Sequence, residues 1–198
     1  MRIVAITTAQ IKELREKSGA GIMESKRALE ETGGNVDKAI EVLRQQGVAK
    51  ASKKADRAAS QGLVEPYIHG GGRIGALVEV NCETDFVART PDFQSLAHDI
   101  AMQVAATAPR YLSAEDIPTG DYAGLESEFG SREEAVTQVA LMDQVFIKNP
   151  KVTIREHVKA HIGKLGENIL VSRFSRFELG GGSSFAAMTT QPTGTDEG

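Results

Sequence analysis

Two histidines, His157 and His161, stand four residues apart in a segment whose apolar pattern predicts a helix. One turn of helix would place both imidazoles on the same face, where they could bind a zinc ion. The zinc-protease pattern also needs a glutamate directly after the first histidine, and this chain has none there and no evident third ligand. We therefore expect a solvated or core-edge helix face and no metal site.

Other residue types that carry catalysis do not form a recognisable pattern. Cys82 is the single cysteine, so it has no partner within the chain for a disulfide, and no serine-histidine-aspartate arrangement stands out. The glycines at 70–72 precede an alternating apolar segment and lack the spacing of a dinucleotide-binding loop. Glu167 and Asn168 are expected to close a helix and begin a strand. We expect no enzyme, no catalytic residue and no bound cofactor.

The stretch Asn-Cys-Glu-Thr-Asp-Phe-Val-Ala-Arg at 81–89 suggests binding instead of catalysis. Phe86 is a large aromatic residue between Asp85 and Arg89, in a segment polar enough to stand out of the fold. Such an aromatic packs either onto its own core or onto the surface of another molecule. Position alone favours a lid on the domain's own core, whereas the flanking charges favour contact with a partner.

Two regular elements must position this loop. Before it, every second residue from 74 to 82 is apolar, which predicts a strand with one buried face. After it, Thr90 and Pro91 mark a helix start, and apolar residues then recur at helical spacing. Residues 85–87 are therefore expected in a short connector between a strand and a helix.

The Thr-Asp-Phe-Val sequence at 84–87 closely resembles the signature loop of the elongation factor Ts family. Residues 18–29 resemble the family's N-terminal pattern, and residues 164–169 and 173–179 resemble its C-terminal pattern. Three separated blocks in the right order are far more specific than any one of them. The resemblance implies an exchange factor that binds elongation factor Tu, GDP-bound or nucleotide-free, and promotes GDP release during translation elongation.

The resemblance also implies how the 84–87 loop acts. In the family this loop enters elongation factor Tu near its magnesium site, where an apolar ring can disturb the groups that hold the ion. Phe86 would be the wedge, and Asp85 would position the loop or make a polar contact. Thr84 and Val87 would shape the loop around them.

A second implied contact lies in the N-terminal block. There the family's glycine turn and the following helix start touch the nucleotide domain of elongation factor Tu. Carried over to this chain, the contacts are Ile22, Met23 and Lys26, with Arg15 as a further candidate. Without the resemblance, Ile22 and Met23 are equally compatible with ordinary helical core.

Length, composition and charge indicate two structural units. With 198 residues and 40% hydrophobic content, the chain can form one or two domains with a real core. The formal net charge is −4, but residues 1–60 carry 12 Lys and Arg against 8 Asp and Glu, whereas the remainder carries 11 against 19. This asymmetry favours a division between the N-terminal part and the rest.

Residues 1–47 are expected to form a helical partner-binding domain. A capping box at Thr7 begins the first helix, the second covers residues 22–32, and Asn35 opens the third. We expect Gly47 to stop this third helix. The compact three-helix unit resembles a ubiquitin-associated-like domain.

Residues 48–60 are alanine-rich and basic, and we expect a linker helix with a solvated face. No aromatic residue is interleaved with the basic ones for base stacking, so direct contact with nucleic acid is not expected. The expected fold class is α+β, with this helix leading into a core domain at 61–180. Residues 181–198 have the Gly, Ser and Thr content of a disordered tail.

The core domain is expected to contain antiparallel strands packed with helices. The expected strands are at 63–68, 73–82, 151–154 and 169–177, and the expected helices follow Pro91 and span 155–165. Residues 125–144 are only weakly periodic, and they lack the longer family segment with its Gly-Lys-Pro-like turn. Because the chain resembles a short form without the second half of the family's core, an uncovered sheet face or edge and a homodimer are expected.

No stretch approaches the roughly 20 apolar residues that span a bilayer, so no membrane association and a cytoplasmic location are expected. Two other functions stay open on the residues alone. A peptide adapter would bind through residues 1–47 and be indifferent to Phe86. A nucleic-acid-binding protein would use the basic segment at 50–57, and its affinity would fall steeply with salt.

Overall fold

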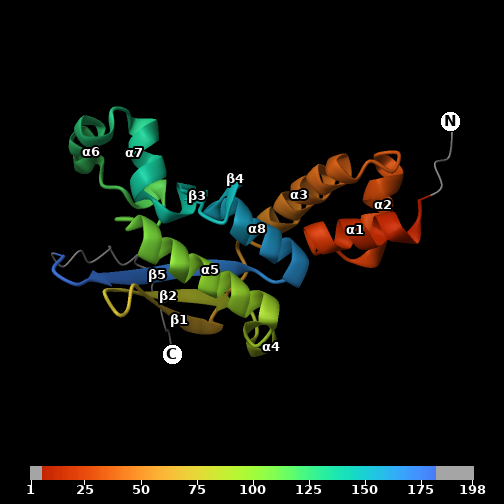
Figure 1. The fold of residues 1–198 in the computed structure, drawn as a ribbon, viewed down its shortest axis with the longest axis horizontal. Helices are drawn as coiled ribbons and strands as arrows, with labels where there is room; N and C mark the ends of the chain where they lie inside the picture. Colours follow the sequence, from red (N-terminus) through yellow and green to blue (C-terminus); the bar gives the residue numbers. More distant parts are fainter. Residues whose placement is uncertain (1–5, 182–198) are drawn as a thin grey trace, which may run out of the picture.

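The computed structural model describes residues 6–181, and its helices and antiparallel strands confirm the expected α+β class (Figure 1). Of the tail predicted at 181–198, residues 182–198 lie outside the described residues. The elements in chain order are α1 Thr8–Ser18, α2 Ile22–Glu31, α3 Val36–Ser52, β1 Gln61–His69, β2 Ile74–Cys82, α4 Asp85–Ala88, α5 Pro91–Thr107, α6 Tyr122–Phe129, α7 Arg132–Val139, β3 Val145–Phe146, β4 Asn149–Thr153, α8 Ile154–Leu165 and β5 Ile169–Glu178.

Helices α1, α2 and α3 pack together as the N-terminal bundle. Thr7 and Gln10 form the predicted capping box at the start of α1, and the Asn35 side chain accepts a hydrogen bond from the Lys38 amide at the start of α3. The apolar faces of the three helices meet in a small core. Its fully buried residues are Leu14, Ala28, Leu29 and Ala39.

The prediction that α3 stops at Gly47 is wrong, because the helix continues to Ser52. The expected linker helix at 48–60 is present only as far as Ser52, as the end of α3, and residues 53–60 form turns and irregular chain. Gly47 has a different role: a Cβ added at Gly163 of α8 would lie 3.0 Å from the Gly47 Cα. The absence of side chains at these two glycines lets α3 and α8 cross closely and joins the bundle to the core domain.

This crossing predicts opposite effects for two alanine substitutions. Gly124 of α6 has open space around it, so Gly124→Ala should stabilise the protein through helix propensity by up to about 1 kcal/mol. Gly163→Ala gains the same propensity but forces α3 away, so it should be less stable than Gly124→Ala by about 1–3 kcal/mol. Denaturant titrations of both variants measure the difference, and equal stabilities would rule out a tight crossing.

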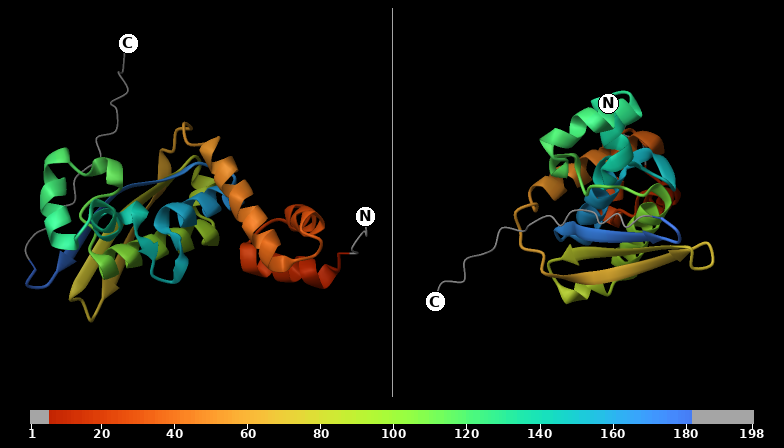
Figure 2. Two further views of the ribbon diagram at one scale, coloured as in Figure 1. Left: turned by 90° about the horizontal axis from the view of Figure 1, so that it is seen from above. Right: turned by 90° about the vertical axis from the view of Figure 1, so that its left-hand side faces the viewer.

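Strands β1, β2 and β5 form an antiparallel sheet in the order β1-β2-β5, with the β1–β2 hairpin as predicted. Helix α5 packs on β1 and β2, and α8 packs beside α5 on the same face (Figure 1). The predicted alternation in β2 is confirmed, because Ala76, Val78, Val80 and Cys82 all point into this core. The opposite face carries no described helix, as the end-on view shows (Figure 2).

Helices α6 and α7 form a small satellite at the far end of the sheet from the bundle (Figure 1). Gly130, at φ +98°, separates them, and the Ser131 side chain caps α7. Their weak periodicity in the sequence has a simple cause, because each helix buries only one or two residues against the other. The buried members of this cluster are Ile117, Leu125, Ala135, Val139 and Ala140.

Candidate partner-binding site

The 84–87 loop is a single helical turn, α4, with its aromatic ring facing solvent. Thr84 is the N-cap, and its hydroxyl accepts a hydrogen bond from the Val87 amide at 3.4 Å. Val87 packs against the core and Ala88 is buried, whereas the Phe86 side chain is 78% exposed. This exposure excludes the interpretation of Phe86 as a lid on its own core.

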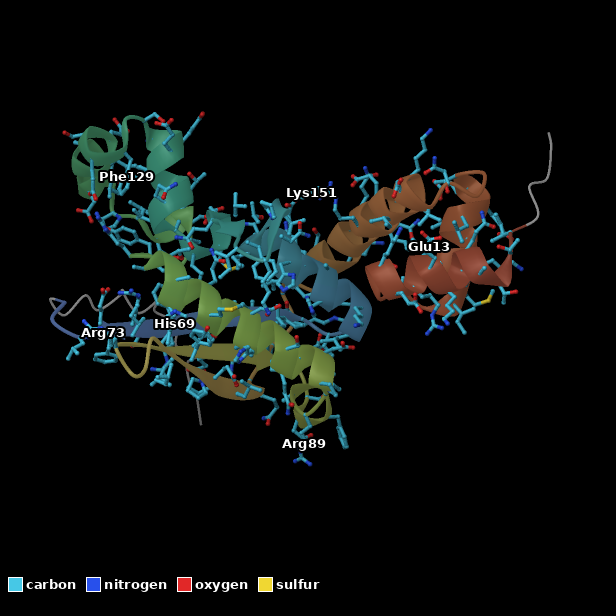
Figure 3. All side chains as sticks on the ribbon, in the orientation of Figure 1. Glu13, His69, Arg73, Arg89, Phe129 and Lys151 are labelled. Carbon is cyan, nitrogen blue, oxygen red and sulfur yellow. The ribbon has the colours of Figure 1, made fainter. Side chains whose placement is uncertain are left out.

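The polar residues of this segment bond to one another and to the backbone of the turn. Arg89 pairs with Asp85 across the turn at 2.8 Å on the surface, where Arg89 projects away from the body of the protein (Figure 3). Thr90 closes the turn by donating from its hydroxyl to the Val87 carbonyl at 2.8 Å, and it also caps α5. The predicted strand, connector and helix are therefore present in that order.

Glu167 anchors the start of α4 from the connection between α8 and β5. Its carboxylate accepts hydrogen bonds from the Thr84 backbone amide at 3.0 Å and from the Thr84 hydroxyl at 2.6 Å. From the sequence, Glu167 was expected only to close a helix, and this contact was not predicted. The two residues are 83 positions apart, so no local spacing could have revealed it.

Cys82 lies directly before the loop and is buried. Its thiol donates a weak hydrogen bond to the Thr84 carbonyl, with 3.1 Å between Sγ and oxygen. Burial raises the pKa of Cys82 above its ordinary value, and nearby Glu167 acts in the same direction. The thiol therefore stays protonated at neutral pH and supports the loop's backbone without acting as a nucleophile.

The N-terminal candidates lie at the turn between α1 and α2. Gly19, at φ +68°, ends α1, and Gly21 precedes the first residue of α2. Ile22 is 56% exposed and Met23 is 61% exposed, so neither belongs to the bundle core. Lys26 is exposed one turn later, and Arg15 is exposed on α1. Contact of these four residues with a partner stays a prediction.

The two candidate surfaces lie toward one end of the molecule. Helix α4 sits at the end of the sheet nearer the bundle, whereas α6 and α7 lie at the other end (Figures 1 and 2). The Phe86 ring and the pair Ile22 and Met23 are two separate exposed apolar surfaces.

The two histidines of α8 pack within the protein. The His157 ring stacks on Phe146 with 4.3 Å between centroids, and its Nε2 lies 3.3 Å from the buried Asp99 carboxylate. Burial lowers the pKa of His161, so this imidazole is neutral at neutral pH. Residues 6–181 contain no group of three or more His, Cys, Asp or Glu placed to bind a metal ion. No helix within them is long and apolar enough to cross a membrane.

Comparison with known proteins decides the family. A family model described as elongation factor TS matches residues 3–129, which contain both candidate surfaces. Elongation factor Ts of Carboxydothermus hydrogenoformans is 50% identical over 196 residues, covering 89% of this chain and 90% of the relative. The chain belongs to the elongation factor Ts family. The elongation factor Ts of Herpetosiphon aurantiacus is 45% identical, with 89% of this chain and 99% of the relative covered.

Membership in the elongation factor Ts family gives the chain a role in translation elongation. The family implies a nucleotide exchange factor with elongation factor Tu as its partner. The relative from Synechococcus is longer, since the alignment covers 90% of this chain and 71% of that protein at 49% identity. The match thus spans nearly the whole length of the first two relatives and a smaller share of the Synechococcus relative.

Proposed function

We propose that this chain promotes GDP release from elongation factor Tu by placing the Phe86 ring against the partner's magnesium site. The observation that carries the proposal is the 78% exposure of that ring on a capped, anchored helical turn in a chain of this family. Exposing a large aromatic to water is unfavourable unless another surface covers it. The exposed position of the ring therefore supports the assignment of Phe86 as the wedge.

The proposed mechanism is a competition between two ligands of the same partner. A ring wedged beside the magnesium site shifts the groups that hold the hydrated ion, and the charge of the β-phosphate is then poorly compensated. GDP consequently dissociates faster. Reciprocity requires that nucleotide weaken the binding of this chain by the same factor, so the nucleotide-free partner binds it most tightly. No covalent bond is made or broken.

The bundle supplies the second half of the proposed interaction. Ile22 and Met23 present exposed apolar side chains at the start of α2, and Lys26 on α2 and Arg15 on α1 are exposed basic residues. We assign these residues to holding the complex together while the 84–87 loop acts on the nucleotide site. In this division the bundle residues determine the affinity for the partner, and the 84–87 loop determines the rate of nucleotide exchange.

The proposed function is tested by release of fluorescent GDP from elongation factor Tu. Addition of this chain in amounts well below the partner should accelerate release in the presence of excess unlabelled GDP, because an exchange factor turns over. Release that is unchanged across a range of concentrations of this chain would refute the proposal. A cytoplasmic location, as expected from the sequence, accompanies it as a prediction.

The uncovered outer face of the sheet supports the predicted homodimer. Ile68, Gly75 and Phe177 stand opposite one another across β1, β2 and β5, and Leu77 lies beside them on the same face. The side chains of Ile68, Leu77 and Phe177 are exposed. An apolar patch across a three-stranded sheet is a surface on which a second copy of the chain could pack.

Self-association should therefore depend on this outer face. Sedimentation of the wild-type chain at micromolar concentration should show a dimer, and Phe177→Asp should sediment as a monomer because a buried unpaired charge opposes packing. Ile147→Asp, at an exposed apolar residue elsewhere, is the control and should leave the dimer intact. A wild-type chain that sediments only as a monomer would exclude the homodimer.

A further inference from the structure

Two consecutive residues, Glu167 and Asn168, join segments that are distant in sequence. Glu167 accepts both hydrogen bonds from Thr84, and the Asn168 backbone amide donates to the Glu83 carboxylate at 2.7 Å. The pair Glu83–Thr84 and the pair Glu167–Asn168 thus each contribute one carboxylate and one backbone amide to the other. Such a reciprocal pair fixes both the distance and the direction between the two chains.

The side chain of Asn168 adds a third segment to this junction. Asn168 is 1% exposed, and its Nδ2 donates to the carbonyl oxygens of Ala55 at 3.2 Å and Arg57 at 2.8 Å. Residues 53–60 follow the end of α3, so the chain that leaves the bundle is tied to the same point as the 84–87 loop. Arg57 reinforces the tie through its ion pair with Glu83 at 3.5 Å.

The loop depends on such external anchors because α4 is too short to be stable alone. Helix α4 spans four residues, and an isolated helix of this length does not form in water. Its N-cap, Thr84, uses its hydroxyl both to accept from Val87 and to donate to Glu167. The carboxylate bonds are the stronger ones, since hydrogen bonds to an ionised acceptor are roughly twice as strong as neutral ones.

We propose that Glu167 is a positioning residue for nucleotide exchange, which fixes Thr84 and thereby holds the Phe86 ring in the direction that the partner requires. This inference rests on the proposed function of Phe86. Without the carboxylate, α4 loosens and the ring samples many directions. Ordering the ring on binding then costs conformational entropy and weakens the interaction. Asn168 holds the same junction to the chain leaving the bundle, which keeps both partner-binding surfaces on one rigid frame.

The first arm of the test compares Glu167→Ala with a matched control at Asp116. Asp116 also accepts from the backbone amide and the hydroxyl of a single residue, Ser113, at 3.0 and 2.6 Å, but it lies in the turns before α6. Glu167→Ala should lower the maximal GDP release rate about tenfold, which corresponds to about 1.4 kcal/mol. Asp116→Ala should leave this rate unchanged, and an equal loss in both variants would overturn the inference.

The second arm asks whether Glu167 acts through the ring. In a Phe86→Ala background, Glu167→Ala should cost less than about twofold, because two residues that act as one unit are not additive. A full additional tenfold loss would show that Glu167 acts by another route. Glu167→Gln keeps an acceptor for the Thr84 amide, so it should recover part of the rate lost in Glu167→Ala. If Glu167→Ala does not fold, Glu167→Gln replaces it in the double-mutant comparison with Phe86→Ala.

A third readout needs no partner. Amide hydrogen exchange at Thr84 and Val87 in the free chain should become faster in Glu167→Ala and stay unchanged in Asp116→Ala. Unaltered protection at both amides would refute the anchoring itself. If the wild-type chain fails to accelerate GDP release, the proposed function fails on that result, and the hydrogen-exchange result still decides whether Glu167 fixes the loop.

Discussion

Replacing Phe86 with alanine is expected to slow stimulated GDP release about 30-fold, the loss of about 2 kcal/mol that marks an interface hot spot. The melting temperature of the free chain should hardly change, because substitution of an exposed side chain usually alters stability by less than about 0.5 kcal/mol. Phe86 is 78% exposed, so its removal opens no cavity. Thermal melts paired with fluorescent GDP release measure both quantities on the same samples.

Phe93→Ala supplies the contrast for this variant. Phe93 is fully buried at the start of α5, so the same truncation there should cost about 3–5 kcal/mol and lower the melting temperature by many degrees. A Phe86→Ala variant that melts like Phe93→Ala but exchanges nucleotide normally in its folded fraction would show that the ring stabilises the fold and does not act on the partner. The wedge mechanism would then be wrong.

Ile22→Ala combined with Met23→Ala should weaken binding to nucleotide-free elongation factor Tu about tenfold to a hundredfold. The maximal release rate at saturating concentration should be retained, because the 84–87 loop is intact. Both side chains are exposed, so the fold of the bundle should be unaffected. Titration calorimetry gives the affinity, and the concentration dependence of GDP release separates affinity from maximal rate.

A double variant at Val145 of β3 and at Ile147, which follows β3, controls for the loss of exposed apolar area. Val145 and Ile147 are similarly aliphatic and exposed, and their double alanine variant should bind the partner with unchanged affinity. If instead the bundle variant lost stability together with affinity, Ile22 and Met23 would support the fold. If it lost neither, the partner would not contact the start of α2.

Local patterns in the sequence predicted the elements that surround the 84–87 loop. Alternation along residues 74–82 identified the buried face of β2, because a strand with one solvated face repeats every two residues. Thr90 and Pro91 predicted the start of α5, where Thr90 caps the helix as expected. These features depend on neighbours in the chain, so a single sequence reveals them.

Features that depend on distant residues could not be predicted in the same way. Gly47 matched a C-terminal stop, but its role is set by Gly163 on another helix. Glu167 anchors Thr84 across 83 positions, and nothing in the local sequence of either residue points to the other. The sequence also left open whether Phe86 faced inward or outward, since a connector permits both directions. In the structure Val87 and Ala88 pack against the core, and Phe86 is exposed.

The most direct measurement of the central claim compares wild type with Phe86→Ala in GDP release from elongation factor Tu, with magnesium and with a chelator. If the ring acts by disturbing magnesium binding, a chelator that removes the ion already produces the effect of the ring. The ratio of the two rates should then fall from about 30-fold with magnesium to below about twofold with the chelator. A ratio that stays the same without magnesium would contradict the account.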